Sequence, residues 1–275
     1  MTTNFSEPVS RLLTLGATNI HEARNYRKLG FTPQHIPDLI RLVEDEELRS
    51  LPWDEDGEAP PEVYAQVHAW RALGQLGALE AIPALLGLLH WIDDDQDDFV
   101  NEEVPVLLGK LGASAIQPCH DYLVDRTKGD YARIAAGSAL AEIGQQHPES
   151  RQACVQKLMS ALGNYRDDDA TINAFTLSAL ADLKAVEAAP LAEEIYQAGC
   201  ADESIMGDYE DFQVAVGLLE KRITPSQGPS HAELSRLLNA LPYSVTASQH
   251  KANKAKKEKA KRKQAKKARH RNRKR

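Results

Sequence analysis

The chain has 275 residues, of which 42% are apolar and 27% are charged, and it carries a net charge of −7 at pH 7. No apolar run approaches the roughly 20 residues that a membrane-spanning helix needs, so we expect no transmembrane segment. The N-terminus lacks the basic and apolar stretches of a secretory leader, and the three cysteines, Cys119, Cys154 and Cys200, are far apart. We therefore expect free, buried thiols and a cytoplasmic protein.

The first 50 residues predict a helical cap at the N-terminal end of the fold. Apolar spacing favours helices over residues 9–15, 19–29 and 33–48. Thr32 and Pro33 are typical of a helix start, because the hydroxyl caps the first turn and proline needs no partner for its missing N–H. Residues 51–61 are acidic and rich in proline, and we interpret them as a connection.

A repeated pattern follows. We assign residues 51–222 to the repeats, and this range includes the acidic connection at its start. Residues 73–77 read Leu-Gly-Gln-Leu-Gly, residues 108–112 read Leu-Gly-Lys-Leu-Gly, and weaker copies begin at Leu140 and Leu180. The first leucines lie 35, 32 and 40 residues apart, a spacing typical of stacked helical repeats. In three copies a proline follows ten residues later, at Pro83, Pro118 and Pro190. Each copy therefore predicts a helix, a short turn and a second helix that opens near a proline.

The first helix of each copy has an apolar face with helical spacing. In one copy this face consists of Val100, Val104, Leu107, Leu108 and Leu111. In another it consists of Ile172, Phe175, Thr176, Ala179, Leu180 and Leu183. Pro105 falls inside the first of these two helices and should kink it or delay its start.

These units resemble HEAT repeats, and in particular the short HEAT-like repeats of the phycobilisome-lyase type. The resemblance rests on residues 72–77 (Ala-Leu-Gly-Gln-Leu-Gly), residues 81–85 (Ala-Ile-Pro-Ala-Leu) and their weaker copies. It implies an all-α fold, a right-handed α-α superhelix of the HEAT/ARM-like solenoid type. It also implies that the repeats bind other proteins.

The composition changes after the repeats. Apolar spacing predicts one further helix over residues 205–219, then a linker and capping helix over 223–243, and a polybasic tail over 244–275. Residues 251–275 carry a net charge of +14, which leaves −21 for the first 250 residues. Such a tail should be disordered alone, or helical on a polyanion. Its candidate contacts with RNA, DNA or an anionic surface are Lys256, Lys257, Lys261, Arg262, Lys263, Lys266, Lys267, Arg269, Arg271 and Arg273.

Acidic clusters recur between the predicted units, often just after an aromatic residue. We expect them to line one edge of the stack as an acidic ridge that binds a basic protein partner. The ridge would consist of Trp53, Asp54, Asp56, Trp91, Asp93, Asp94, Asp95, Tyr165, Asp167, Asp168, Asp169, Asp208, Glu210 and Asp211. Two other interpretations of these clusters stay open. The carboxylates could stabilise helix N-termini, or they could bind a divalent metal. Asp98 stands where an EF-hand loop needs glycine, which argues against a calcium loop of that kind.

We find no constellation that indicates catalysis, a cofactor or a metal centre, and we expect none of the three. The sequence predicts a non-catalytic scaffold or adaptor for protein–protein interaction. One alternative is a nucleic-acid or ribosome-associated factor that acts through the tail. Another, implied by the resemblance, is a phycobilin lyase-like chaperone for a chromophore.

Overall fold

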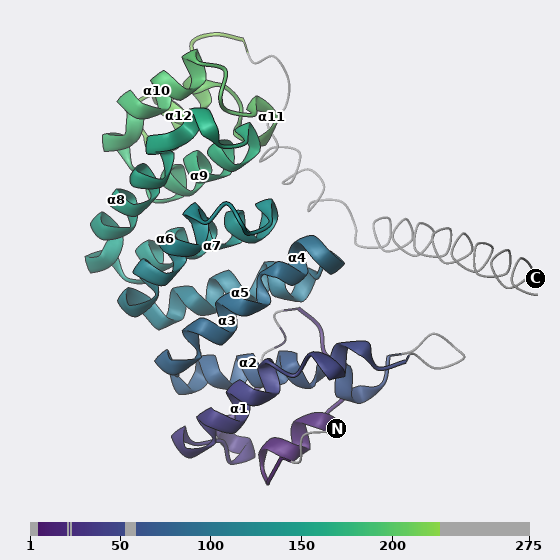
Figure 1. Cartoon of the computed structure of the whole chain (residues 1–275). Helices are drawn as coiled ribbons and strands as arrows, with labels where there is room; N and C mark the ends of the chain where they lie inside the picture. Colours follow the sequence, from purple (N-terminus) through teal and green to yellow (C-terminus); the bar gives the residue numbers. More distant parts are fainter. Residues whose placement is uncertain (1–4, 21, 23, 53–58, 226–275) are drawn as a thin grey trace, which may run out of the picture. The chain divides into compact units, whose positions relative to one another are not determined.

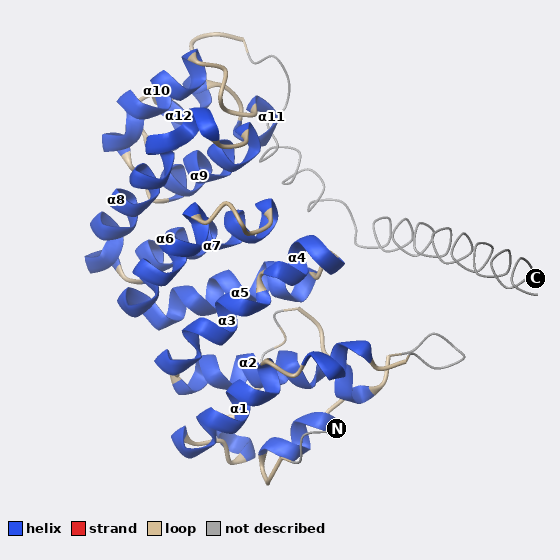
Figure 2. Cartoon of the chain, viewed as in Figure 1, coloured by secondary structure: helices blue, strands red, loops and turns tan. Residues whose placement is uncertain are grey.

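The computed structural model describes residues 5–20, 22, 24–52 and 59–225 of the chain. These residues form helices and loops, and no strand occurs among them (Figure 2). The all-α prediction is therefore confirmed for this part of the chain. The chain divides into two compact units, Met1–Ser226 and Gln227–Arg275, and every described residue lies in the first. The predictions for Trp53, Asp54, Asp56, the capping helix and the polybasic tail lie outside the described residues.

The N-terminal region is less helical than the sequence predicts. It contains short 3-10 helices and one α-helix: η1 (Val9–Thr14), η2 (Arg27–Leu29), η3 (Pro33–His35), α1 (Ile36–Val43) and η4 (Glu46–Ser50). The helix predicted over residues 19–29 is wrong, because the segment before η2 bonds to another helix instead of to its own preceding turn. The N–H of Tyr26 donates to Oε1 of Gln75 at 2.9 Å. In turn, Nε2 of Gln75 donates to the carbonyl of Arg24 at 2.5 Å. The start at Thr32 and Pro33 is confirmed, and the Thr32 N–H donates to Nδ1 of His35.

The four repeats form pairs of helices as predicted. The pairs are α2 (Ala65–Leu76) with α3 (Ile82–Leu88), α5 (Asp98–Leu111) with α6 (Ile116–Val124), α7 (Asp130–Gln146) with α8 (Arg151–Ala161), and α9 (Ala170–Asp182) with α10 (Ala189–Gln197). Short 3-10 turns lead into these helices at η5 (Pro61–Tyr64), η6 (Leu79–Ala81), η7 (Gly112–Ala115), η8 (Pro148–Ser150), η9 (Leu162–Asp167) and η10 (Val186–Ala188). The turn after α2 is made by Gly77, whose φ of 71° is left-handed and therefore suits glycine.

Pro105 lies in the interior of α5, which starts at Asp98, so of its two predicted effects the delayed start does not occur. Two details differ from the prediction. An extra helix, α4 (His90–Asp95), stands between the first two pairs. The single helix predicted over residues 205–219 is two helices, α11 (Glu203–Met206) and α12 (Tyr209–Val216), because Gly207 has a φ of 94° and Asp208 caps α12 anew.

The helices of successive pairs pack in sequence order (Figure 1). The first helices make one row, in which α2 contacts α5, α5 contacts α7 and α7 contacts α9, while α3, α6 and α8 make a second row. The first leucine of every repeated motif is fully buried, since Leu73, Leu108, Leu140 and Leu180 are each 0% exposed. The repeated pattern thus marks the positions that fill the core between neighbouring pairs.

Glycine allows the first helices to approach one another closely. A Cβ atom at Gly74 would collide with the Leu107 side chain of α5. A Cβ at Gly109 would lie 2.7 Å from Cβ of Glu142, and one at Gly144 would lie 2.6 Å from the Leu183 side chain. The same close contact therefore recurs at three successive joints between first helices.

Cationic side chains close the C-terminal ends of the first helices from neighbouring units. Arg27 donates to the carbonyl of Gln75 at 3.0 and 2.6 Å, and Arg151 donates to that of Leu183 at 2.7 Å. Lys184 donates to the carbonyl of Ala215 at the end of α12. Carbonyls in the last turn of a helix have no partner within it, so each contact satisfies a polar group and joins two units.

Cys119 and Cys154 are buried and Cys200 is half-buried, and all three are free thiols. Burial raises the pKa of Cys119 to about 12, so its thiol stays protonated at neutral pH. Among the described residues, no helix is both long and apolar enough to cross a membrane.

Candidate functional site

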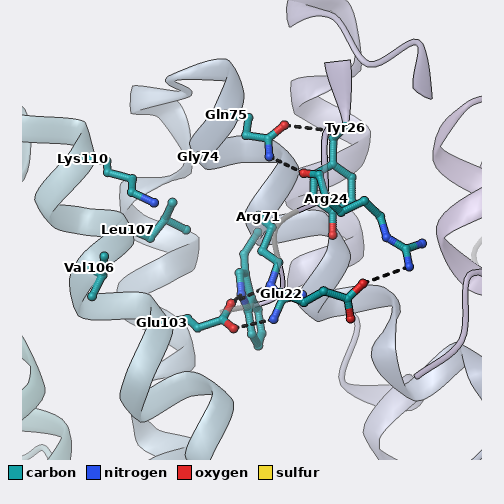
Figure 3. Close-up of a pocket in the computed structure, with 11 residues that line it drawn as sticks. Glu22, Arg24, Tyr26, Arg71, Gly74, Gln75, Glu103, Val106, Leu107 and Lys110 are labelled. Atoms are coloured by element: carbon teal, nitrogen blue, oxygen red, sulfur yellow. Dashed lines mark hydrogen bonds and ion pairs between the residues drawn. The ribbon is translucent and has the colours of Figure 1, made fainter. Parts of the chain in front are cut away.

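A hollow in the described part of the chain lies between α2, α5 and the N-terminal residues Glu22, Arg24 and Tyr26 (Figure 3). Its volume is about 400 Å³, within the usual range for binding pockets. Helix α2 contributes Arg71 and Gly74, and helix α5 contributes Glu103, Leu107 and Lys110. We call this hollow the groove.

A buried carboxylate forms the floor of the groove. Glu103 accepts from Nε1 of Trp70 at 3.1 Å, and from two guanidinium nitrogens of Arg71 at 2.8 and 2.5 Å. The two charged side chains are only 10% and 8% exposed. Such a bidentate pair is held in one geometry because both charges are removed from water and neutralise each other.

The same arginine fastens the N-terminal segment to the groove. Arg71 also donates to the hydroxyl of Thr18 and to the carbonyl of Asn19, each at 2.7 Å. Since these bonds occupy its guanidinium, Arg71 positions the walls and is already neutralised by Glu103. The floor is therefore preorganised before anything binds.

A buried histidine supports the wall behind Tyr26. The Tyr26 hydroxyl lies 2.8 Å from Nδ1 of His68, and Nε2 of His68 lies 3.0 Å from the carbonyl of Gly16. A carbonyl can only accept, so Nε2 carries the proton and Nδ1 accepts from the tyrosine. Burial lowers the pKa of His68 and keeps the ring neutral.

The rim of the groove is cationic. Lys110 is exposed at one side, and at the other side Arg24 and Gln75 separate the groove from a second hollow of about 350 Å³, which Asn25 and Arg27 also line. Arg24 pairs with Glu22 at 3.2 Å. Among the described residues, no carboxylate forms an ion pair with Arg27 or Lys110. Lys110 at the groove and Arg27 at the second hollow are therefore two positive charges that no described carboxylate pairs with, on a strongly acidic body.

Several predicted ridge residues do lie together, at the ends of successive helices. We call these residues, together with Asp97, which was not among the predicted ones, the acidic edge; it consists of Asp93, Asp94, Asp95, Asp97, Asp167, Asp168 and Asp169. Asp93, on α4, accepts from the N–H groups of Tyr131 and Ala132 at 3.1 and 2.9 Å, which are at the start of α7. Arg133 in the first turn of α7 pairs with Asp168 at 2.8 Å, just before α9. These contacts connect the two clusters from different units.

Part of the acidic edge has a structural role. Asp97 caps α5 through the N–H of Val100, and Asp169 caps α9 through that of Thr171. Helix α7 begins after Gly129, which has no side chain to cap it, and Asp93 takes that role from the neighbouring unit. The reading that carboxylates stabilise helix N-termini therefore applies to these three residues.

Other residues of the acidic edge remain exposed. Asp94, Asp95 and Asp167 point to solvent, and no described residue forms an ion pair or hydrogen bond with their side chains. Of the predicted aromatics, Trp91 is half-buried under the guanidinium of Arg49 at 4.6 Å, and Tyr165 is buried.

The last predicted cluster is a separate arrangement around one arginine. Arg222 pairs with Asp208 at 2.7 Å, with Glu210 at 3.3 Å and with Asp211. The Arg222 guanidinium lowers the pKa of Asp208 to about 2. These carboxylates hold the segment after α12 in place, and none of the contacts described above joins them to the acidic edge.

Sequence reasoning missed the groove, although one signal was present. Glu103 lies three residues after Val100 and one before Val104, on the apolar face predicted for that helix. A charge on a buried face requires a buried partner, which turns out to be Arg71. Its location could not be read from the sequence because it depends on how α2 and α5 pack.

The groove and the acidic edge contain side chains suited to binding. In the described part of the chain, no group of three or more His, Cys, Asp and Glu residues is arranged to hold a metal ion. Comparison of the chain with models of protein families, with curated proteins and with solved structures finds no match in any of the three.

Proposed function

We propose that this chain is a non-catalytic interaction scaffold that binds a basic segment of a partner protein along its acidic edge. The observation that carries the proposal is the position of Asp94 and Asp95. Both are exposed in the last turn of α4, and neither has a partner among the described residues.

Helix stability does not account for these two carboxylates. The C-terminal end of a helix is the negative end of its dipole, where an acidic side chain costs roughly 0.3–1 kcal/mol and a cation is favoured. Asp93, one residue earlier, is explained by its bonds to α7. A basic partner would offset the cost at Asp94 and Asp95, and it would gain charge complementarity along the edge.

The architecture that we propose for the scaffold is a HEAT-like right-handed solenoid. The repeated burial of Leu73, Leu108, Leu140 and Leu180 supports it, as does the packing of the first helices in sequence order. Stacked pairs of this kind present one surface built from equivalent parts of several units, which suits binding of an extended partner.

Charge reversal at the acidic edge tests the proposal. Full-length wild-type chain and the double variant Asp94→Lys/Asp95→Lys would be titrated with a labelled octapeptide of alternating lysine and leucine. The variant should lose binding, while Glu193→Lys/Glu194→Lys, an equal change of charge at exposed positions on α10, should not. Equal binding by all three proteins would contradict the acidic edge as the binding surface.

A second candidate is a nucleic-acid or ribosome-associated factor, favoured by the net charge of +14 over residues 251–275. Binding through such a segment should be independent of sequence and should weaken steeply as salt rises. A titration with single-stranded RNA at several salt concentrations tests it. The phycobilin lyase-like alternative stays a prediction, which a bilin-binding assay would test.

A further inference from the structure

We infer that the groove is a second binding site, which takes an extended acidic peptide with a large apolar side chain. This surface is distinct from the acidic edge, and it has the opposite charge. The inference rests on the shape of the groove, its rigid floor and the uncompensated charge of its rim.

The shape suits an extended chain. The groove and the neighbouring hollow lie next to each other and share Arg24 and Gln75 as a common wall. Both are open to solvent. A compact small molecule would fill only one of them, whereas a peptide that advances about 3.3 Å per residue can pass over the shared wall and occupy both.

The groove itself offers one apolar position. Val106 and Leu107 of α5 stand opposite the Tyr26 side of the groove, and the Leu107 side chain packs directly onto Gly74 of α2 (Figure 3). Val106 is partly exposed and presents its methyl groups to the open part of the groove. The floor beneath is closed by the neutralised pair of Arg71 and Glu103. A large aliphatic or aromatic side chain would bury apolar area there without leaving a charge unpaired.

The rim supplies the charge selection. Lys110 flanks this apolar position on one side and Arg24 flanks it on the other, while Arg27 lines the second hollow beyond Arg24. Arg27 uses its N–H groups on the Gln75 carbonyl, and no carboxylate among the described residues pairs with its charge. One or two carboxylates on either side of the apolar residue would match this pattern. A nucleic acid, with a phosphate at every residue, would be repelled by the acidic body around the groove.

A randomised library of ten-residue peptides, panned on immobilised full-length chain, tests the inference. Peptides enriched on the wild type should contain Asp or Glu next to a large apolar residue. The variant Lys110→Glu reverses an exposed charge and should lower the affinity of those peptides about fivefold to tenfold, because an attraction becomes a repulsion. Lys157→Glu, the same change on α8, is the matched control and should change it less than about twofold.

A second variant examines the apolar position. Val106→Asn should keep the preference for acidic residues and lose the preference for an apolar neighbour. Any binding of acidic peptides by the lysine-rich C-terminal residues is common to all variants, so the comparison among them removes it. Binding of the alternating lysine and leucine peptide should not decrease in Lys110→Glu, which separates this inference from the proposed function.

Three results would overturn the inference. They are no enrichment of acidic peptides on the wild type, equal affinity of the wild type and Lys110→Glu, and equal losses in Lys110→Glu and Lys157→Glu. The last would mean that the overall charge, and not the groove, governs binding.

Discussion

Carboxylates have opposite surroundings in the groove and at the acidic edge. Glu103 in the groove is buried and accepts three hydrogen bonds, whereas Asp94 at the edge is exposed and has no partner among the described residues. A buried carboxylate must be satisfied within the fold, while an exposed one can be left for another molecule. The number of intramolecular partners therefore separates carboxylates that build this protein from those that are free to bind.

The largest effect expected from this comparison is at the floor of the groove. Glu103→Ala leaves the Arg71 charge and the Trp70 N–H buried without their acceptor, and it should lower the free energy of unfolding by roughly 3–5 kcal/mol. Urea unfolding of the full chain measures it. Glu102→Ala removes the exposed neighbouring carboxylate and should stay within about 0.5 kcal/mol of wild type.

A small effect of Glu103→Ala on stability would contradict the structural role of this buried carboxylate. A loss under about 1 kcal/mol, similar to that of Glu102→Ala, would mean that the ion pair does not hold the groove in place.

A smaller difference should separate two adjacent residues of the acidic edge. Asp93→Ala removes the cap that α4 supplies to α7, and it should cost about 0.5–2 kcal/mol. Asp94→Ala removes an exposed charge from the negative end of α4, and it should change stability by a few tenths or increase it slightly. Thermal unfolding of both variants measures the two changes in stability. Equal losses of stability would show that Asp94 also has a structural role.

The groove should also respond to pH through His68. Its folded pKa lies below the ordinary value of about 6.5, so its contribution to stability is present above that pH and is lost as the pH falls further. The slope for one group is at most about 1.4 kcal/mol per pH unit. His68→Gln should flatten the stability curve between pH 7 and 5, and a slope equal to that of the wild type would show that His68 is not the source of the pH dependence.

The smallest expected effect concerns Asp208, which is partly exposed. Its pKa of about 2 lies below the unfolded value, so its contribution is complete above about pH 4 and is lost as the pH falls from about 4 to about 2. Asp208→Asn can still cap α12 but cannot pair with Arg222. The variant should therefore lose this acid-dependent step, and Arg222→Ala should lose it as well. A step that persists in both variants would assign it to other carboxylates.

The repeated helices could be predicted because their determinants are local. Leu73, Gly77 and Pro83 mark a buried position, a turn and a helix start within eleven residues. The errors arose where distant contacts overrode local preference. The backbone just before Arg27 does not form helical hydrogen bonds, because the N–H of Tyr26 donates to the side chain of Gln75, which is 49 residues later in the chain.

The candidate site was predictable in part for the same reason. The sequence marks clusters of carboxylates, and their place at helix ends follows from ordinary capping. The sequence does not show that Asp93, and not Asp94, accepts hydrogen bonds from the start of α7, because this depends on which side of α4 faces α7. The groove depended on the packing of α2 against α5 and on the irregular path of residues 24–26, and neither was visible in the sequence.

Ribosomes release a chain from its N-terminus, so Arg27 emerges 48 residues before the carbonyl that it meets at Gln75. Arg151 and Lys184 likewise precede the helix ends that they close, by 32 and 31 residues. Helices α2, α9 and α12 can therefore be capped as soon as they leave the exit tunnel. Helix α5 is different, because the Gly109 carbonyl accepts locally from the N–H of Gly112, and its contact with a neighbouring unit comes only with His147, 38 residues after Gly109. Translation that pauses between these two residues would leave α5 as the open end of a growing stack, the point at which a chaperone would be most useful.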